Sequence, residues 1–398
     1  MLWVALNTKA QGRFWGGTEM AGKRRIREFT VRNFKSHAET TVKLGDFNVF
    51  IGENGAGKSN LLDSLLAVSD LQLEAVSPVF KPPRRSYFGE CYRREGRGDM
   101  EFEIEFVAKT RGYRYSLVLE PFSDYQSAIV SKETLCDVET GDNLLQTEYG
   151  KGKALDVSDG VKRGVDYSTD SVVLARLQDR SKFPWAVEAH GFLSSMRRFH
   201  FDPDTMRLPS KVDPSANLGE KGETVAAVFD RMEREVQDAV NGIMSSSGPD
   251  ISRMEARASY GGTKVVAARE TWDPTPFHAD QISDGVLRFL GLVMLAHGGT
   301  DAGVCLVEEP ENGLNPRRYV GLVDLYRSAA AQGGPQFLLA THSVVFVDHL
   351  EEGELYHVSK EKGASLVKRV SDIPGFGDRW RAFDGPLGET WFAGLIEE

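Results

Sequence analysis

The chain has 398 residues, of which 41% are hydrophobic and 27% are charged, and its formal net charge is −10. This length allows two lobes or one large domain with an insertion, and the composition is ordinary for a soluble globular protein. The negative charge excludes general coating of nucleic acid, although local basic patches could still touch a phosphate backbone.

The sequence carries no signal for membrane insertion or export. No run approaches the roughly 20 apolar residues of a membrane span, and the opening segment lacks the basic start and apolar core of a signal peptide. The three cysteines, Cys91, Cys136 and Cys305, form no Cys-x-x-Cys pair, which argues against disulfides or a zinc knuckle. We expect a cytoplasmic protein that is not a membrane subunit. Residues 1–19, before Met20, are expected to be a disordered extension or the product of an upstream start, and the N-terminal extension as a whole is placed at 1–21.

A phosphate-binding loop follows the first predicted strands. The segment FNVFIGENGAGKSNLLDSLL (residues 47–66) contains the pattern G-x-x-x-x-G-K-[ST], whose glycines let backbone N–H groups converge on phosphate oxygens. In this pattern Lys58 reaches the β- and γ-phosphates and the Ser59 hydroxyl coordinates Mg²⁺. The apolar run before the loop predicts a buried strand, and the run after it predicts a helix whose N-terminus favours the anion. The predicted nucleotide-binding residues are Asn54, Gly55, Ala56, Gly57, Lys58, Ser59 and Asn60.

Two further patterns precede residue 150. Residues 101–121 alternate apolar and polar in two runs around a glycine, which predicts an antiparallel hairpin that joins residues 127–136 in a β-subdomain. Residues 77–97 are rich in arginine and contain a proline pair, which predicts a loop. This loop is either solvated or a contact for nucleic acid or a partner, and we favour the first reading.

The middle of the chain, residues 151–280, is expected to be an inserted, mostly helical region. It contains one clear amphipathic pattern, and no heptad repeat persists beyond about three turns, so we expect a compact dimer or ring without a long coiled-coil arm. The apolar face of the predicted helix consists of Val225, Val228, Phe229, Met232, Val236 and Val240.

A small polar turn, Ser283, Asp284 and Gly285, directly precedes a segment with helical apolar spacing. Serine and glycine at a helix N-terminus form an anion site in their own right. They equally suit a simple N-cap, so the sequence leaves both interpretations open.

Paired carboxylates follow the next predicted strand, Val304 to Val307. At the C-terminal end of a parallel strand, this pair would face the phosphate crevice. Glu308 would hold Mg²⁺ through water, and Glu309 would orient or deprotonate the attacking water. An exposed Glu-Glu turn is the simpler alternative, which the preceding strand and the following Pro310 make less attractive.

A second predicted core strand, residues 337–339, ends at Thr341-His342-Ser343. A histidine at this position can touch the γ-phosphate and report its loss. The predicted catalytic residues are therefore Glu309, Glu308 and His342, and the predicted metal ligands are Ser59 and Glu308. Together with the phosphate loop they predict an ATPase that uses ATP and Mg²⁺.

The order of these motifs resembles the ABC-type ATPase heads of the SMC and RecF group. More narrowly, it resembles compact bacterial AAA-family ATPases related to RecF and to the overcoming-lysogenization-defect (OLD) proteins. The strand ending Asn-Phe-Lys-Ser before the loop and the motifs EEPENGL and THS carry the resemblance, which covers most of residues 24–398. It implies an α/β P-loop NTPase fold, an ABC-type ATPase head with a β-subdomain and a helical insertion. The implied parts are an extension at 1–21, lobe I at 22–150, the insertion at 151–280 and lobe II at 281–398.

The resemblance also implies how the heads work together. Ser283, Asp284 and Gly285 would contact the γ-phosphate of ATP bound by another protomer, and Asn312 and Gly313 would couple the two sites. ATP would then be sandwiched between heads of a homo-oligomer, a dimer or higher. The chain departs from the family in three places. Glu308 replaces a common aspartate, Asn315 a common histidine, and the glutamine that senses Mg²⁺ cannot be placed, since Gln126 is only a weak candidate.

Several functions stay open at this stage. We favour a molecular switch for a separately encoded effector, for example in phage defence, because the 56 residues after His342 (398 − 342) are too few for a nuclease domain. The alternative is a RecF-like repair ATPase that clamps duplex DNA, with Lys23 to Arg27 and Lys81 to Arg97 as basic contacts. A transporter subunit fits the motifs least. A non-enzymatic scaffold is disfavoured because Glu309 and His342 are both present.

Overall fold

The computed structural model of the chain describes residues 24–81, 85–91, 98–109, 111–122, 127–246 and 251–396. The chain divides into two compact units, each assembled from segments that are distant in sequence. We call Gly22–Met196 with Glu352–Phe376 the P-loop unit, and Arg197–Glu351 with Gly377–Glu398 the carboxylate unit. No helix within the described ranges is long and apolar enough to cross a membrane.

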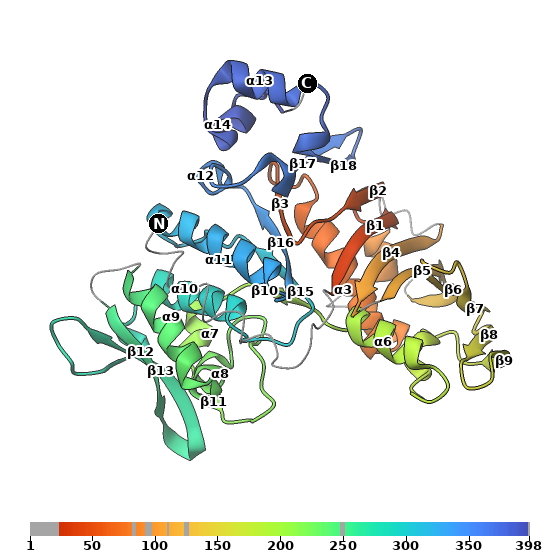
Figure 1. Cartoon of the computed structure of the whole chain (residues 1–398), viewed down its shortest axis with the longest axis horizontal. Helices are drawn as coiled ribbons and strands as arrows, with labels where there is room; N and C mark the ends of the chain where they lie inside the picture. The colour runs from red at the N-terminus through yellow and green to blue at the C-terminus, as the bar shows by residue number, and fades with distance from the viewer. Residues whose placement is uncertain are drawn as a thin grey trace. The chain divides into compact units, whose positions relative to one another are not determined.

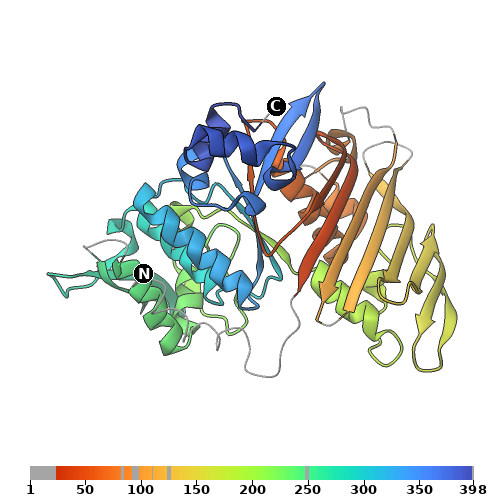
Figure 2. The same cartoon turned by 45° about the horizontal axis from the view of Figure 1, so that its top comes forward.

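The P-loop unit contains an eight-stranded antiparallel sheet, whose strands run side by side in the order β2-β1-β4-β5-β6-β7-β8-β9 (Figure 2). The strands are β1 (Arg25–Phe34), β2 (His37–Lys43), β4 (Met100–Ala108), β5 (Arg111–Pro121), β6 (Ala128–Asp137), β7 (Asn143–Glu148), β8 (Lys151–Asp156) and β9 (Val161–Asp166). The predicted hairpin and β-subdomain are confirmed. Its turn is at Lys109, which has a positive φ of 53°, and Gly112 instead pairs with Val107 inside the sheet.

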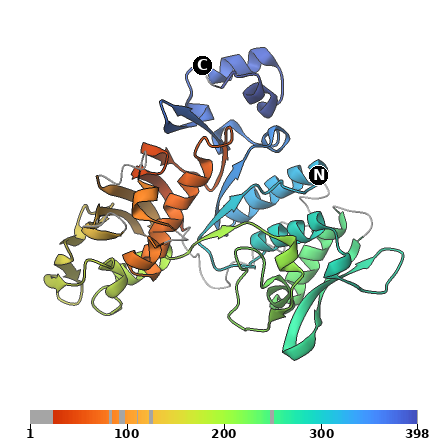
Figure 3. The same ribbon diagram turned by 180° about the vertical axis from the view of Figure 1, so that it is seen from behind.

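One face of this sheet is apolar because its strands alternate. In β4, every second side chain from Met100 to Ala108 is buried, and the three glutamates between them lie on the other face. The helices α3 (Lys58–Leu73) and α6 (Pro184–Leu193) cover the apolar face (Figure 3). The ring of Phe192 in α6 stacks on Phe106 of β4, with ring centroids 4.9 Å apart.

A second group of strands in this unit supports the phosphate loop. The strand β3 (Phe47–Ile51) pairs in parallel with β17 (Leu355–Glu361), which pairs antiparallel with β18 (Ala364–Arg369). All five residues of β3 are buried, as expected for a strand covered on both faces. The loop leads from β3 directly into α3, which confirms the predicted strand-loop-helix order.

The arginine-rich segment 77–97 is more structured than predicted. Its described part contains α5 (Tyr87–Glu90), and the end of α4 (Val76–Val79) precedes it, so the prediction of a simple loop is wrong there. The Ser86 side chain caps α5 by accepting a hydrogen bond from the Gly89 N–H. The Tyr87 ring is fully buried, and its hydroxyl donates to the Leu119 carbonyl at 2.9 Å. Aromatic burial of this kind outweighs the turn-forming composition around it.

The carboxylate unit is built on two parallel strands, β15 (Val304–Glu308) and β16 (Gln336–Thr341), and β10 (Met196–Phe199) flanks β15. Every residue of β16 is buried, and both predicted core strands are confirmed. Glu308 pairs in register with Ala340, so the two strands end side by side. The helices outside the inserted region are α10 (Asp284–Ala296), α11 (Tyr319–Ala331), α12 (Val344–Val347), α13 (Phe376–Phe383) and α14 (Leu387–Phe392) (Figure 1).

The region 151–280 is not mostly helical, and this expectation is wrong. Beyond β8, β9 and β10 it contains the hairpin of β12 (Ile251–Ala258) and β13 (Thr263–Glu270) (Figure 1). Only Met254 of β12 is buried, so the strand carries almost no apolar pattern, and its clearest local signal is the Tyr260-Gly-Gly turn. The remaining α-helices and strands are α6, given above, α7 (Pro203–Met206), β11 (Ser210–Lys211), α8 (Val225–Arg231), α9 (Arg234–Ser246) and β14 (Phe277–His278).

The single amphipathic helix predicted over residues 225–240 is in fact two helices, α8 and α9. Met232 has an extended ψ of 142°, which ends α8. The chain re-enters helical structure at Arg234 with the same side inward, because five of the six predicted apolar positions are buried and Met232 is half-buried. The apolar residues keep the helical spacing of 3.6 residues across the gap between α8 and α9. The apolar pattern alone therefore does not show that the helix is interrupted.

Candidate functional site

The phosphate loop is closed on one side and open on the other. A Cβ added to Gly52 would lie 2.0 Å from the Val358 carbonyl oxygen, and one added to Gly57 would lie 2.1 Å from Ser365 Oγ. Gly57 also has a φ of 117°, a conformation that only glycine adopts readily. Around Gly55, with a φ of 79°, no atom of the described residues beyond its chain neighbours lies within 4 Å of an added Cβ. The loop thus packs against β17 and β18 at Gly52 and Gly57 and is open at Gly55.

Lys58 begins α3, and its ammonium group bends back over the loop. Its Nζ donates to the Gly52 carbonyl at 2.7 Å and to the Glu53 carbonyl at 3.0 Å. The N-terminus of this 16-residue helix carries the positive end of the helix dipole, which favours anions. Ser59 is exposed on the first turn. The Asn60 amide instead donates to Ser36 Oγ at 2.7 Å, so in this structure it braces the turn between β1 and β2.

A buried histidine, which the sequence pattern did not reveal, contacts the backbone of the phosphate loop. His37 is fully buried; its Nε2 lies 3.1 Å from the Gly57 carbonyl oxygen, and its Nδ1 lies 2.8 Å from Thr40 Oγ1. Ser365 Oγ donates to the Ala56 carbonyl beside it. Burial lowers the pKa of His37 to about 4.

This histidine predicts a pH-dependent stability. Because its pKa is about 4 in the folded chain and about 6.5 when unfolded, its stabilising effect is complete above pH 6.5. It is lost as the pH falls towards 4. The loss amounts to about 3 kcal/mol in the free energy of unfolding. Denaturant unfolding at pH 7.5 and pH 4.5 should show a steeper loss for the wild type than for His37→Gln. Equal losses in the two proteins would contradict this role.

The predicted catalytic residues of the carboxylate unit meet at the ends of β15 and β16. Glu309 Oε1 lies 3.5 Å from His342 Nδ1, and both side chains are about half exposed. The backbone N–H of Glu309 donates to the Ala340 carbonyl at 2.8 Å. Glu309 has a φ of 47°, in the left-handed region. For a residue with a Cβ this costs about 1–3 kcal/mol, and such strain is concentrated at functional sites.

Glu311 joins the two loops that carry Glu309 and His342, and sequence reasoning missed it. Its side chain is buried and accepts a hydrogen bond from the Thr341 hydroxyl. The same Thr341 oxygen accepts the Ser343 N–H at 3.0 Å. Burial raises the pKa of Glu311. In the sequence, Glu311 is marked only as the third glutamate of the motif EEPENGL.

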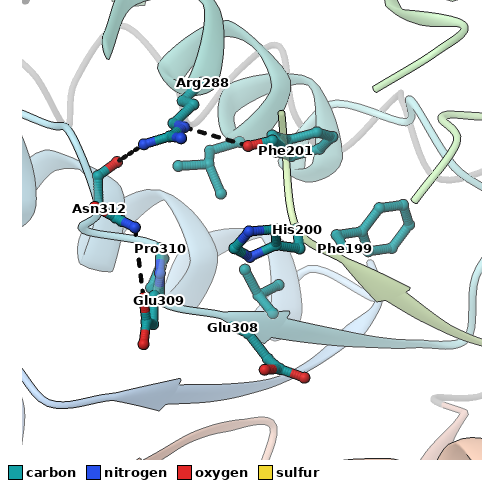
Figure 4. Close-up of a pocket in the computed structure, with 10 residues that line it drawn as sticks. Phe199, His200, Phe201, Arg288, Glu308, Glu309, Pro310 and Asn312 are labelled. Carbon is teal, nitrogen blue, oxygen red and sulfur yellow. Dashed lines mark hydrogen bonds between the residues drawn. The ribbon is translucent and has the colours of Figure 1, made fainter. Parts of the chain in front are cut away.

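A small cavity lies beside the paired carboxylates (Figure 4). Its lining includes Glu308, Glu309 and Asn312 from the end of β15 and the loop after it, His200 from the end of β10, and Arg288 from α10. His200 and Arg288 were not predicted as site residues. They come from segments with no recognisable motif, and only the folded unit brings them to the carboxylates.

The polar turn at residues 283–285 begins α10, as predicted. Ser283 is the N-cap residue and its backbone carbonyl accepts the Val286 and Leu287 N–H groups. Its exposed hydroxyl makes no capping hydrogen bond within the described part of the chain. The Asp284 carboxylate is paired with Arg207 Nη2 at 2.6 Å. Ser283 therefore occupies the N-cap position without a side-chain capping hydrogen bond, and the anion site stays a prediction.

Close packing around Gly285 leaves no room for a side chain at this position. A Cβ there would lie 2.4 Å from the carbonyl oxygen of Gly313. Arg318 Nη1 also donates to the Gly285 carbonyl at 3.4 Å. The start of α10 thus rests directly on the loop that follows Glu309.

The predicted residues form two groups, one in each unit. The P-loop unit holds Asn54 to Asn60, including the predicted ligand Ser59. The carboxylate unit holds residues 283–285, both catalytic glutamates and His342. Their joint action on one nucleotide stays a prediction.

Two arginines from the predicted basic segments are internal. Arg25 is buried and pairs with Asp46 at 2.9 Å. Arg85 is buried and pairs with Asp63 and Asp70, each at 2.7 Å. Lys23 and residues 82–84 and 92–97 lie outside the described residues. These two guanidinium groups stabilise the fold and are not presented to a phosphate backbone.

A protein-family profile described as "AAA domain, putative AbiEii toxin, Type IV TA system" matches residues 47–348. Two curated relatives match a short stretch. The DNA double-strand break repair Rad50 ATPase of Sulfolobus acidocaldarius is 57% identical over 42 residues, and that of Pyrococcus abyssi is 51% identical over 43 residues. These stretches cover 10% and 11% of this chain and 5% of each relative, so the chain spans a small fraction of their length.

Solved structures show the fold. The SMC head bound to the C-winged helix domain of ScpA is similar with a TM-score of 0.52 at 14% identity, covering 86% of this chain and 97% of that one. An Smc head with an extended coiled coil, bound to the C-terminal domain of ScpA from Pyrococcus furiosus, has a TM-score of 0.51 at 12% identity, covering 87% and 96%. The predicted α/β fold of an ABC-type P-loop head is confirmed.

Proposed function

Because the chain belongs to this AAA domain family, we propose that it is a Mg²⁺-dependent ATPase whose heads sandwich ATP. The observation that carries the proposal is the placement of Glu309, with a strained backbone, beside His342 where two parallel strands end. In open α/β sheets, ligands bind in the crevice beyond the carboxyl ends of the strands.

The residues of the P-loop unit fit a triphosphate. The open space at Gly55 leaves room for phosphate oxygens. The Lys58 ammonium group would then donate to these oxygens in place of the Gly52 and Glu53 carbonyls. Ser59 and Glu308 would hold Mg²⁺, since it prefers oxygen ligands and takes one or two from the protein. When bound, this ion neutralises charge that develops on the phosphates. Glu309 would orient and deprotonate the attacking water.

The turn at α10 supports a contact in trans. The Ser283 hydroxyl is exposed and is not used to cap its own helix, and the charge of Asp284 is neutralised by Arg207. An exposed helix N-terminus with these properties suits the γ-phosphate of ATP bound to another protomer. The active form is accordingly a homo-oligomer, a dimer or higher.

The biological role is a further part of the proposal. The family description reads "putative AbiEii toxin, Type IV TA system", and we propose that the chain is a cytoplasmic switch that acts on a separately encoded effector, for example in antiviral defence. Hydrolysis would end the ATP-bound state and so reset the switch.

A DNA-repair clamp is the second candidate, and one surface favours it. A groove on β6 to β9 is lined by Lys132, Lys151, Lys153 and Lys162 and by one carboxylate, Glu148. A local excess of lysines on a chain with net charge −10 suits a phosphate backbone.

Steady-state ATP turnover with and without linear duplex DNA tests both candidates, with Glu309→Gln as the blank. We expect a real, Glu309-dependent rate that DNA leaves unchanged, which supports a switch governed by a protein. Stimulation of several-fold by DNA, lost in Lys151→Glu/Lys153→Glu, would favour the clamp. A wild-type rate no higher than that of the buffer without protein would contradict ATP hydrolysis by this chain.

A further inference from the structure

Arg288 lies on the second turn of α10 and connects three segments of the carboxylate unit. Its Nε donates to the Phe201 carbonyl at 3.2 Å, and its Nη1 donates to the Asn312 carbonyl at 3.2 Å (Figure 4). The guanidinium also lies against Gly313, where an added Cβ would be 2.8 Å from Nη1. One rigid fork therefore fixes the loop after Glu309 to both α10 and the end of β10.

Asn312, which Arg288 holds, in turn contacts Glu309, the residue with the proposed catalytic carboxylate. Its backbone N–H donates to the Glu309 carbonyl at 3.0 Å, and its Nδ2 lies 3.4 Å from Glu309 Oε2. Glu309 needs such support because its φ of 47° is unfavourable, and strained residues persist only where their surroundings hold them. Arg288 is thus one residue removed from the group proposed to activate water.

We propose that Arg288 is a positioning residue: it makes the position of the Glu309 carboxylate depend on the position of α10. The inference rests on the proposed catalytic role of Glu309. Since the N-terminus of the same helix carries Ser283, a phosphate bound there would act on Glu309 through Arg288 and Asn312. Hydrolysis would then depend on assembly of the heads.

Turnover of Arg288→Lys and Arg288→Ala tests this inference. A lysine keeps the charge and the aliphatic stem, but it lacks the planar fork that joins two carbonyls. We expect kcat to fall about 10- to 100-fold, because a small misplacement of a catalytic group has effects of this size, while KM and ATP affinity change less than twofold. Amide exchange at residues 309–313 should accelerate. Millimolar guanidinium should partly restore the kcat of Arg288→Ala.

The control is Arg317→Ala, which removes an exposed arginine just beyond the same loop and should leave kcat unchanged. A wild-type kcat in Arg288→Lys, with turnover still abolished by Glu309→Gln, would overturn the inference and leave the proposed function intact. Turnover that does not depend on Glu309 would instead remove the catalytic role of Glu309 on which the inference rests, and absence of ATP turnover would remove the proposed function. If Arg288→Ala does not fold, kcat and amide exchange of Arg288→Lys decide.

Discussion

Glu309→Gln is expected to bind ATP with wild-type affinity and to hydrolyse it about 10²- to 10⁴-fold more slowly, the range for removal of a general base. Glutamine has the same length, so the contact with the Asn312 amide and the backbone turn are retained. What it loses is the carboxylate that can accept a proton from water. Binding and chemistry should therefore separate cleanly.

Single-turnover and steady-state assays measure the chemistry, and equilibrium binding of a fluorescent ATP analogue measures affinity. Glu361→Gln, at an exposed site at the end of β17, is the matched control for loss of one carboxylate. Hydrolysis by Glu309→Gln at the wild-type rate would refute the assigned role. A parallel loss of ATP affinity would show that the carboxylate mainly supports the fold of its loop.

The motif residues could be predicted because each lies in a local context that the sequence itself contains. Lys58 follows an apolar run and begins a helical one, and Glu308 ends a run of four apolar residues. Such strand-loop-helix signals involve neighbours in the chain, and the structure confirms the elements on which they depend.

The supporting residues could not be predicted because their contacts are distant in sequence. Ser36 and Ser365, which meet behind the phosphate loop, are 329 residues apart, and their hydroxyl oxygens are 2.7 Å from each other. Arg85 is part of an arginine-rich segment whose composition indicates exposure, yet it is buried between two aspartates of α3. The sequence shows that a residue is charged, but it does not show whether the fold places an oppositely charged side chain close enough to pair with it.

Ser283→Leu is expected to abolish turnover, by about 100-fold or more if the lost phosphate contact resembles other preorganised donors at a developing charge. Ser283 is exposed at the N-terminus of a 13-residue helix, so the isolated protomer can accommodate the leucine without repacking. Only a second protomer, bringing its ATP to this turn, would meet the extra bulk. ATP affinity of the monomer should consequently stay within twofold of wild type.

Light scattering of the protein with ATP, in the Glu309→Gln background that slows hydrolysis, measures assembly directly. Ser283→Leu should remain monomeric where the Glu309→Gln parent assembles, and Ser283→Ala, which removes the hydroxyl but adds no bulk, should assemble with a smaller loss. If Ser283→Leu lowers the ATP affinity of the monomer instead, the turn contacts nucleotide within its own chain. The contact in trans would then be wrong, and with it the dependence of hydrolysis on a second head.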